Sequence, residues 1–508
     1  SGSMYNHTLG VDTSDTIFQV SSGEAKAGVA VVRISGACAF PAYRHVTRRK
    51  RLPQPRKATL CSLYDNHGSV IDSKVLGLVF PCPNSYTGDD TVEFHVHGNP
   101  SIVRELLQTL GSLSSLRPAM PGEFTRRAFE NGKLDLLQVE GLADLMESET
   151  KAQRIQALDQ IKGDTGQFYE KWRDELLSSL AHLEAVIDFG EDEADVEEDI
   201  VMGSVIPKLE RVKSAISNAL SDTKRGEIVR CGVSVAIVGA PNAGKSTLLN
   251  ALVRRDAAII SEIPGTTRDV IQVNMNIGGY SVILSDTAGI REETDDPIER
   301  LGISRSASES KSADFRVLVV DVTEDIDNAQ TLVQSVLGDG PSLLVLSKSD
   351  KADSQRHVEE AHTRIKQFLS SIGSMSSTVV VVSCKHDEGV NDLLQHLKSA
   401  ITQLLAPAPV GEKGGKQQQD SDLGHDTAEG TIPIRGGGAV ITRARHRTHL
   451  QHTLTALQNA LAEARDNNDH VIACEELRQA VHELNKILGR VDVEQLLDIL
   501  FRDFCIGK

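Results

Sequence analysis

A glycine-rich loop in the middle of the chain limits its possible folds more than any other feature of the 508 residues. Gly239–Ser246 has the pattern G-x-x-x-x-G-K-S, and it stands between the apolar run Val233–Val238 and the helix-like run Thr247–Val253. Its glycines let backbone N–H groups close around phosphate oxygens, while Lys245 neutralises them and the Ser246 hydroxyl reaches Mg²⁺. A strand, a phosphate loop and a helix in this order predict an α/β nucleotide-binding domain built on a parallel sheet.

Further strands of this sheet are expected at the apolar runs Val282–Leu284, Val317–Val320, Leu343–Leu346 and Val379–Val382. Short motifs behind three of these runs predict that the nucleotide is GTP. Asp286 stands where a carboxylate holds Mg²⁺ through water, Gly289 can meet the γ-phosphate, and Thr267 can bring a second hydroxyl to the metal. Asp350 can accept hydrogen bonds from guanine N1–H and the 2-amino group, which adenine does not offer together. The GTP-binding residues predicted by these motifs are Asn242, Ala243, Gly244, Lys245, Ser246, Thr247, Thr267, Asp286, Thr287, Ala288, Gly289, Lys348, Asp350, Ser383, Cys384 and Lys385.

Two positions depart from the usual GTPase pattern. Ser347 replaces the Asn of Asn-Lys-x-Asp, which predicts retained guanine preference with weaker affinity, unless a neighbour or a water substitutes without loss. Ile290 stands where Ras-like switches carry the Gln that orients the attacking water. An apolar side chain cannot do this, so we expect another part of the chain, a potassium ion or a second subunit to supply the function. The segment Arg291–Arg300 offers several carboxylates for this purpose, and spacing does not select among them.

Charge and cysteine content exclude several classes of protein. The net charge of −17 argues against a whole-surface polyanion binder, so RNA must dock on a local basic patch. The two strongest basic stretches are Arg44–Lys57 and Arg443–Arg447, although such runs are usually just solvated. The seven cysteines contain no CxxC pair, which excludes a disulfide scaffold or zinc ribbon and indicates a reducing compartment. No apolar run approaches the ~18 residues of a membrane span.

The pattern of strand-like and helix-like segments changes along the chain, and these changes predict several domains. An α+β unit is expected first, with strands at Ile17–Val20, Gly28–Ile34, Val75–Phe80 and Thr91–Val96 and a helix over 102–116. An acidic run at 188–199 is expected to be a solvated loop. Helical segments flank the nucleotide-binding unit, which indicates that this unit is inserted into an all-α domain. Their expected apolar stripes are Trp172, Leu176, Leu180, Leu183 and Ile187 before the unit, and Leu477, Val481, Leu484 and Leu488 after it. The predicted limits are 4–131 (α+β), 132–231 (helical, first half), 232–405 (Ras-like G domain), 406–438 (flexible linker) and 439–508 (helical, second half).

The motifs as a set resemble those of the MnmE (TrmE) tRNA-modification GTPases, in particular their mitochondrial members. The resemblance covers nearly the full chain. Besides the nucleotide motifs, it rests on Arg33-Ile-Ser-Gly36, Asn84-Ser-Tyr-Thr-Gly-Asp89, Glu93-Phe-His-Val-His-Gly98, Pro121-Gly-Glu-Phe-Thr-Arg126, Asn131-Gly-Lys-Leu-Asp135 and the terminal Phe504-Cys-Ile-Gly-Lys508.

The resemblance implies a chemistry for the N-terminal domain. That domain is expected to dimerise and to bind a reduced folate, 5-formyl- or 5,10-methylene-tetrahydrofolate, through Arg33, Glu93, Lys133 and Lys508. Cys505 is implied in the modification chemistry, with a buried small hydrophobe as the alternative.

The resemblance also implies how hydrolysis works. The first switch would be Ser261, Glu262, Ile263, Pro264, Gly265, Thr266 and Thr267. A potassium ion would be held by Asn242, Ser261, Ile263 and Thr266, and Mg²⁺ by Ser246 and Thr267. Paired G domains would close this ion site, and Glu299 would be the catalytic carboxylate.

The expected function is a potassium-stimulated GTPase that acts with a flavin-dependent, MnmG-type partner on C5 of the wobble uridine, position 34, of tRNA. The product would be taurinomethyl-type in mitochondria and aminomethyl-type in bacteria. The Glu93–His97 string and the low-complexity stretch 411–430 favour a mitochondrial member over a bacterial cytoplasmic one. Two alternatives are a GTP-regulated binding switch, such as a ribosome-assembly factor, and a folate enzyme with a vestigial G domain.

Overall fold

The computed structural model forms two compact units. The first comprises Ser1–Ala143, Gln160–Ala181 and Leu477–Lys508, and the second comprises Asp144–Asp159 and His182–Glu476. The structure describes residues 15–23, 26–189, 195–240, 242–255, 271–286, 313–323, 342–352, 355–371, 378–406, 441–467, 469–491, 494–502, 504 and 507.

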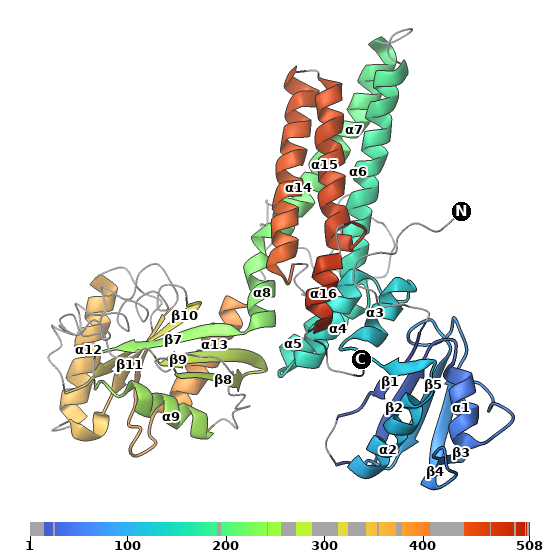
Figure 1. Cartoon of the computed structure of the whole chain (residues 1–508). Coiled ribbons are helices and arrows are strands. Elements are labelled where there is room, and N and C mark those ends of the chain that lie inside the picture. Colours follow the sequence, from blue (N-terminus) through green and yellow to red (C-terminus); the bar gives the residue numbers. More distant parts are fainter. Residues whose placement is uncertain are drawn as a thin grey trace, which may run out of the picture. The chain divides into compact units, whose positions relative to one another are not determined.

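A six-stranded sheet forms the N-terminal part of the first unit (Figure 1). Its strand order is β3-β4-β5-β2-β1-β6, and every pairing is antiparallel except that of β1 with β6. The sheet packs its apolar side chains against two helices around one buried core. The elements are β1 (Thr16–Val20), β2 (Ala30–Ser35), α1 (Ala39–Thr47), β3 (Thr59–Tyr64), β4 (Val70–Phe80), β5 (Thr91–Val96), α2 (Pro100–Gly111), β6 (Leu116–Pro118) and α3 (Glu123–Glu130).

The sequence predicted four of these strands and missed two. β5 has the predicted limits, whereas β4 begins at Val70, earlier than expected. The helix predicted over 102–116 is α2, which begins after its cap Asn99 and ends at Gly111, because the chain turns there toward β6. β3 was missed because it is an edge strand behind a proline-rich segment. β6 was missed because it has only three residues.

Helices complete the first unit. Leu136 and Val139 of α4 (Leu136–Glu147) form an apolar cluster with four side chains at the C-terminal end of the chain. Those four are Leu497, Leu500 and Phe501 of α16 (Glu494–Arg502), and Phe504. The predicted stripe Leu477, Val481, Leu484 and Leu488 is buried on α15 (His470–Leu488).

The second unit contains the predicted nucleotide-binding sheet. Its order is β12-β11-β10-β7-β9-β8, and all strands are parallel except β8, which is antiparallel to β9. Apolar clusters fill both faces, as a parallel sheet wrapped by helices requires. The elements are β7 (Val233–Gly239), α9 (Lys245–Arg255), β8 (Ile271–Ile277), β9 (Tyr280–Asp286), β10 (Phe315–Asp321), β11 (Ser342–Ser347), α12 (Gln355–Ser371), β12 (Thr378–Val381) and α13 (Val390–Leu404).

The sequence located every parallel strand of this sheet but missed β8. That strand alternates apolar and polar residues, whereas the prediction searched for continuous apolar runs. The fold class is therefore the predicted one: an α+β domain, a helical domain and a P-loop GTPase domain.

Long helices lead into and away from the GTPase sheet. They are α5 (Lys151–Ile161), α6 (Asp164–Phe189), α7 (Asp195–Ser221), α8 (Thr223–Cys231) and α14 (Ala444–Ala462). The acidic run was expected to be a loop throughout, and this is wrong, because its backbone is helical at both ends. Trp172, Leu176, Leu180 and Leu183 of the predicted stripe on α6 are buried, whereas Ile187 is exposed. Among the described helices, none is long and apolar enough to cross a membrane.

Candidate functional site

The phosphate loop joins β7 to α9, as the sequence predicted. Asn242 and Gly244 both have positive φ angles, 64° and 97°, so the backbone turns sharply just before the helix. A side chain at Gly239 would collide with the carbonyl of Val319 on β10, which explains the glycine at this position. The exposed Ser246 and Thr247 lie in the first turn of α9, where the helix N-terminus attracts anions. The residues present therefore fit a bound nucleotide phosphate.

Lys245 is held inside the loop by the protein's own oxygens. Its side-chain nitrogen donates to the carbonyls of Gly239 at 3.1 Å and Ala240 at 2.8 Å, and the residue is only 6% exposed. A buried ammonium needs acceptors of this kind. The position places the charge at the centre of the loop, where a phosphate can take over from the carbonyls.

Ser347 ties the phosphate loop to the neighbouring strands. Its buried hydroxyl lies 2.6 Å from the carbonyl of Ala243 and 3.1 Å from that of Val320. The short side chain at the usual Asn position therefore still reaches the loop backbone. Next to it, Lys348 pairs with Asp321 at 2.6 Å, and Thr323 donates twice to the same carboxylate.

The predicted guanine-binding residues lie together beyond β11 and β12. The Ser383 hydroxyl donates to Asp350 at 2.9 Å, which orients the carboxylate. Cys384 follows, and burial together with Asp350 and Asp387 raises the pKa of its thiol, so the thiol stays neutral. Lys385 is exposed. The structure thus brings Asp350, Ser383 and Cys384 to the same edge of the sheet as the phosphate loop.

Several predicted residues lie outside the described part of the chain. They are Ser261, Glu262, Ile263, Pro264, Gly265, Thr266, Thr267, Thr287, Ala288, Gly289, Glu299, Cys505 and Lys508. Asp286 ends β9, and only its backbone is described. Its strand runs parallel to β7, so its Cα lies at the same edge of the sheet as the phosphate loop.

The N-terminal sheet brings Arg33 and Glu93 together. They face each other in register on β2 and β5, and the Arg33 Nε donates to the Glu93 carboxylate at 2.9 Å. Both side chains remain partly accessible, at 17% and 18% exposure. A guanidinium and a carboxylate side by side can bind a ligand that carries both acceptor and donor groups.

Two aromatic residues complete this pair, and the sequence reasoning missed them. The Arg33 guanidinium lies 4.9 Å from the ring centre of Tyr86 and 5.5 Å from that of Phe124. The hydroxyl of Tyr86 is hydrogen-bonded to Thr125 at 2.9 Å, which fixes the ring. Both aromatics stand inside quoted motifs, so the motifs themselves were the available signal.

Two further segments of the chain lie near the N-terminal sheet that carries Arg33 and Glu93. Lys133 is exposed, and Asn131 just before it donates to the carbonyl of Thr87 beside Tyr86. Gly507, the last described residue, lies against the backbone carbonyl of Val20 on β1 and has a φ of 101°, which favours glycine. The end of the chain therefore approaches the strand that neighbours β2.

His95 and His97, which share a strand face, contact different carboxylates. His97 bonds to the buried Asp72 at 2.8 Å, while His95 lies 3.8 Å from Glu93. The interpretation of these histidines as packing or pocket-shaping residues fits this arrangement better than a metal pair.

A carboxylate that is only 11% exposed joins the two segments that enter and leave the nucleotide-binding sheet. Asp144, at the end of α4, accepts from Arg230 at 2.8 Å and from Arg443 at 2.7 Å. Arg230 lies just before β7, and Arg443 just before α14. No sequence motif indicates this arrangement, because the three residues are far apart along the chain.

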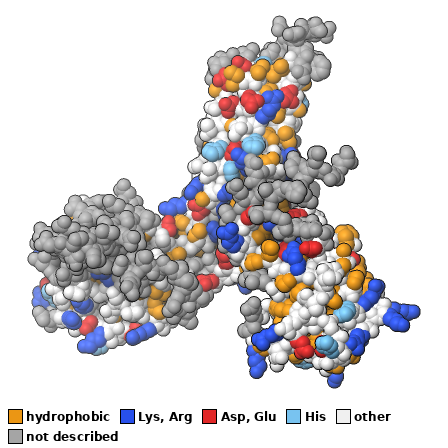
Figure 2. All heavy atoms as spheres, in the orientation of Figure 1, with side chains coloured by type: hydrophobic (Ala, Val, Ile, Leu, Met, Phe, Trp, Pro, Cys, Tyr) orange, Lys and Arg blue, Asp and Glu red, His pale blue; other side chains and the backbone are white. Residues whose placement is uncertain are grey.

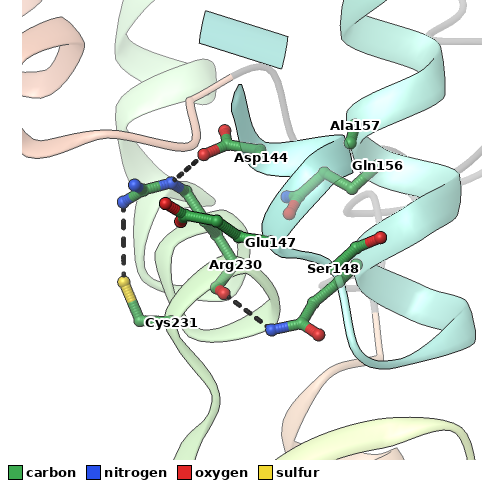
Figure 3. A pocket seen from close by; sticks show the side chains of 8 residues that line it. Asp144, Glu147, Ser148, Gln156, Ala157, Arg230 and Cys231 are labelled. Atoms are coloured by element: carbon green, nitrogen blue, oxygen red, sulfur yellow. Dashed lines mark hydrogen bonds and ion pairs between the residues drawn. The ribbon is translucent and has the colours of Figure 1, made fainter. Parts of the chain in front are cut away.

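A polar cavity of about 320 Å³ lies beside this junction (Figure 3). Figure 3 shows Arg230 pointing toward Asp144, with Glu147, Gln156 and Cys231 around it. The α5 helix is fastened to the same place, since Gln153 donates to the Arg230 carbonyl at 3.0 Å. Its first turn also reaches the GTPase sheet, because the Ala152 N–H donates to Gly279 in the β8–β9 turn.

Comparison with known proteins shows the family of the chain. The model of the MnmE helical domain matches residues 136–505, and that of the GTP-binding protein TrmE N-terminus matches residues 16–133. The chain is 41% identical to a zebrafish (Danio rerio) protein named 5-taurinomethyluridine-[tRNA] synthase subunit GTPB3, mitochondrial, over 97% of this chain and 93% of the relative. The human protein of the same name is 39% identical over the same shares.

A bacterial relative is equally similar. The tRNA modification GTPase MnmE of Agrobacterium fabrum is 41% identical over 98% of this chain and 100% of its own length. The chain belongs to the MnmE (TrmE) family, and it is a GTPase that takes part in tRNA modification.

Proposed function

We propose that this GTPase is stimulated by potassium and acts with a flavin-dependent, MnmG-type partner to modify C5 of the wobble uridine, using a reduced folate as one-carbon donor. The observation that carries the proposal is the Arg33–Glu93 pair beside two aromatic rings. Each expected domain would have its own role. Residues 4–131 would hold the folate site and the dimer interface, and residues 232–405 would hydrolyse GTP.

The donor set of the N-terminal site fits a folate. The Arg33 guanidinium suits a folate carboxylate or formyl oxygen, and the Glu93 carboxylate suits the paired N–H donors of the pterin. Arg33 is held by Glu93 and the aromatic rings, so it needs little reorganisation when the ligand arrives. Lys133, Lys508 and Cys505 are proposed to complete the site. When bound, the folate supplies the carbon, while these side chains bind and orient it.

The phosphate loop supports the proposed hydrolysis. Lys245 would exchange its two carbonyl partners for nucleotide oxygens, and Ser246 and Thr267 would hold Mg²⁺. Ile290 cannot position water, so Glu299 is proposed to do so. A potassium ion on Asn242, Ser261, Ile263 and Thr266 would supply positive charge, as an arginine finger does elsewhere, an effect worth roughly 10³–10⁵ in rate.

The name of the zebrafish relative supports a taurinomethyl-type product, and therefore a mitochondrial location. The bacterial relative supports the other option, an aminomethyl-type product in a bacterial cell. We favour the first, because the Glu93–His97 string and the stretch 411–430 resemble organellar members.

Hydrolysis in different salts tests the potassium role. GTP turnover by the full chain is expected to be faster in KCl than in NaCl and to be lost in Glu299→Ala. Glu292→Ala is the matched control, because it removes a carboxylate of the same segment. Equal rates in both salts would contradict the potassium role, and loss of activity in Glu292→Ala alone would reassign the catalytic carboxylate.

Equilibrium dialysis with 5-formyltetrahydrofolate tests the folate role independently of GTP. Glu93→Gln is expected to weaken binding at least tenfold, since it removes the acceptor for the pterin. His97→Gln is the control, because His97 contacts Asp72 instead. If the unaltered chain does not bind the folate, the alternative of a GTP-regulated switch without one-carbon chemistry is favoured.

A further inference from the structure

The two basic stretches, which are equal candidates for RNA contact by sequence, differ in the ion pairs that their side chains form. In the C-terminal stretch, Arg443 pairs with Asp144 at 2.7 Å and Arg447 with Glu227 at 2.8 Å. Arg445 is hydrogen-bonded to His446, which is buried. Arg443 and Arg447 therefore join segments of the second unit, and a carboxylate compensates the charge of each.

The N-terminal stretch has no such partners. All seven Lys and Arg side chains between residues 44 and 57 are exposed, and none of them forms an ion pair with another described residue. No Asp or Glu occurs anywhere from residue 25 to residue 64. In a chain of net charge −17, this segment is a local exception.

Three of the arginines fix the shape of this segment. The Arg48 guanidinium lies 5.1 Å from the ring centre of Tyr64, and Arg49 donates to the carbonyl of Leu60 at 2.6 Å. Arg56 donates to the carbonyl of Asn84 at 2.7 Å. The segment between α1 and β3 is therefore fastened at three points to the body of the domain.

The remaining four cations are free to bind a ligand. The side chains of Arg44, Lys50, Arg51 and Lys57 make no hydrogen bond or ion pair with any other residue that the structure describes. We call these four the α1–β3 basic surface. Figure 2 shows Lys and Arg side chains gathered along the edge of the N-terminal domain where α1 and β3 lie.

We propose that the α1–β3 basic surface binds the phosphate backbone of the tRNA substrate. The proposal rests on the tRNA role of this GTPase and names the surface that carries it. Cations on a fastened segment lose little conformational freedom on binding, and binding of phosphates releases counterions. The Arg48 guanidinium lies over the Tyr64 ring, so this ring is not proposed to stack on bases, and the proposed contact is to phosphate.

Binding of a fluorescent, unmodified tRNA transcript to the full chain at several KCl concentrations tests the proposal. The triple variant Lys50→Gln, Arg51→Gln, Lys57→Gln is expected to bind at least tenfold more weakly. Its salt dependence should also fall by about one unit in log–log slope for each contact removed. GTP turnover without RNA and the melting temperature should stay unchanged, because these exposed side chains make no hydrogen bond or ion pair with another described residue.

The matched control removes the same charge from another surface. Arg356→Gln, Arg364→Gln, Lys366→Gln alters three exposed cations of α12 and changes the net charge equally. Equal losses in both variants would overturn the proposal, because the effect would then be that of net charge alone. Unchanged tRNA binding in the first variant, with loss of binding to phosphatidylserine vesicles, would reassign the surface to a membrane. Failure of the unaltered chain to bind tRNA would contradict the tRNA role itself, whatever the folate and GTP experiments show.

Discussion

Arg44–Lys57 and Arg443–Arg447 look alike as sequence, and the structure gives them opposite roles. In the C-terminal stretch the arginines face carboxylates and stabilise the helices around the GTPase sheet. In the N-terminal stretch, four cations face no described acid and remain available to a ligand. Whether a run of basic residues can bind a ligand therefore depends on whether the fold pairs it with acidic side chains.

Desolvation explains why this difference has energetic consequences. Asp144 is 11% exposed and Arg443 17% exposed, so neither charge is well hydrated, and each depends on its partner. Removal of one member of a buried pair leaves an uncompensated charge, which costs far more than the pair itself contributes. An exposed cation keeps its water and costs nothing when removed.

The largest expected effect is that of Asp144→Asn, which removes the carboxylate that accepts hydrogen bonds from two arginines. The free energy of unfolding of the second unit should fall by about 3–5 kcal/mol, measured by urea denaturation. Asp174→Asn, at an exposed carboxylate that pairs with Arg173, should change it by less than about 0.5 kcal/mol. Similar effects of the two variants would show that the junction is no more important than a surface pair.

A smaller effect is expected when the two stretches are compared directly. Arg443→Met should lower the denaturation midpoint by the equivalent of about 1–3 kcal/mol, because it leaves a buried acceptor with one partner fewer. Arg51→Met should leave the midpoint unchanged within about 0.5 kcal/mol. The two variants should differ in the opposite sense in tRNA binding: Arg51→Met should bind tRNA more weakly, and Arg443→Met should bind it as the unaltered chain does. If the same variant had the larger effect in both the denaturation assay and the tRNA-binding assay, the two stretches would not have the different roles inferred here.

The smallest effect concerns pH and a second carboxylate held by two arginines. Burial raises the pKa of Glu123, but hydrogen bonds from Arg117 outweigh it, and the pKa lies below its ordinary value. The resulting stability is present above the unfolded pKa of about 4.3 and is lost as the pH falls through the folded pKa. Arg117→Gln should therefore flatten the dependence of stability on pH between about pH 3 and pH 5. Arg51→Gln should leave that dependence unchanged.

The sequence predicted the nucleotide site in detail because its signals are local. A phosphate loop needs glycine, lysine and serine at set spacings between a strand and a helix, and Gly239–Ser246 has them in that order. Parallel strands are continuous apolar runs, so all of them were located, whereas the half-polar β8 was not. Arg33 and Glu93 were identified through motifs, but their direct pairing across β2 and β5 was not foreseen.

The chain's sequence by itself determined the GTPase motif set and the family, because both depend on short spacings that do not require knowledge of the tertiary packing. Only the tertiary structure decided which charges are paired. Asp144 meets Arg230 and Arg443 from distant parts of the chain, and Arg33 gains the rings of Tyr86 and Phe124. An ion pair depends on distance in space and on loss of water, and neither can be read from separation along the chain.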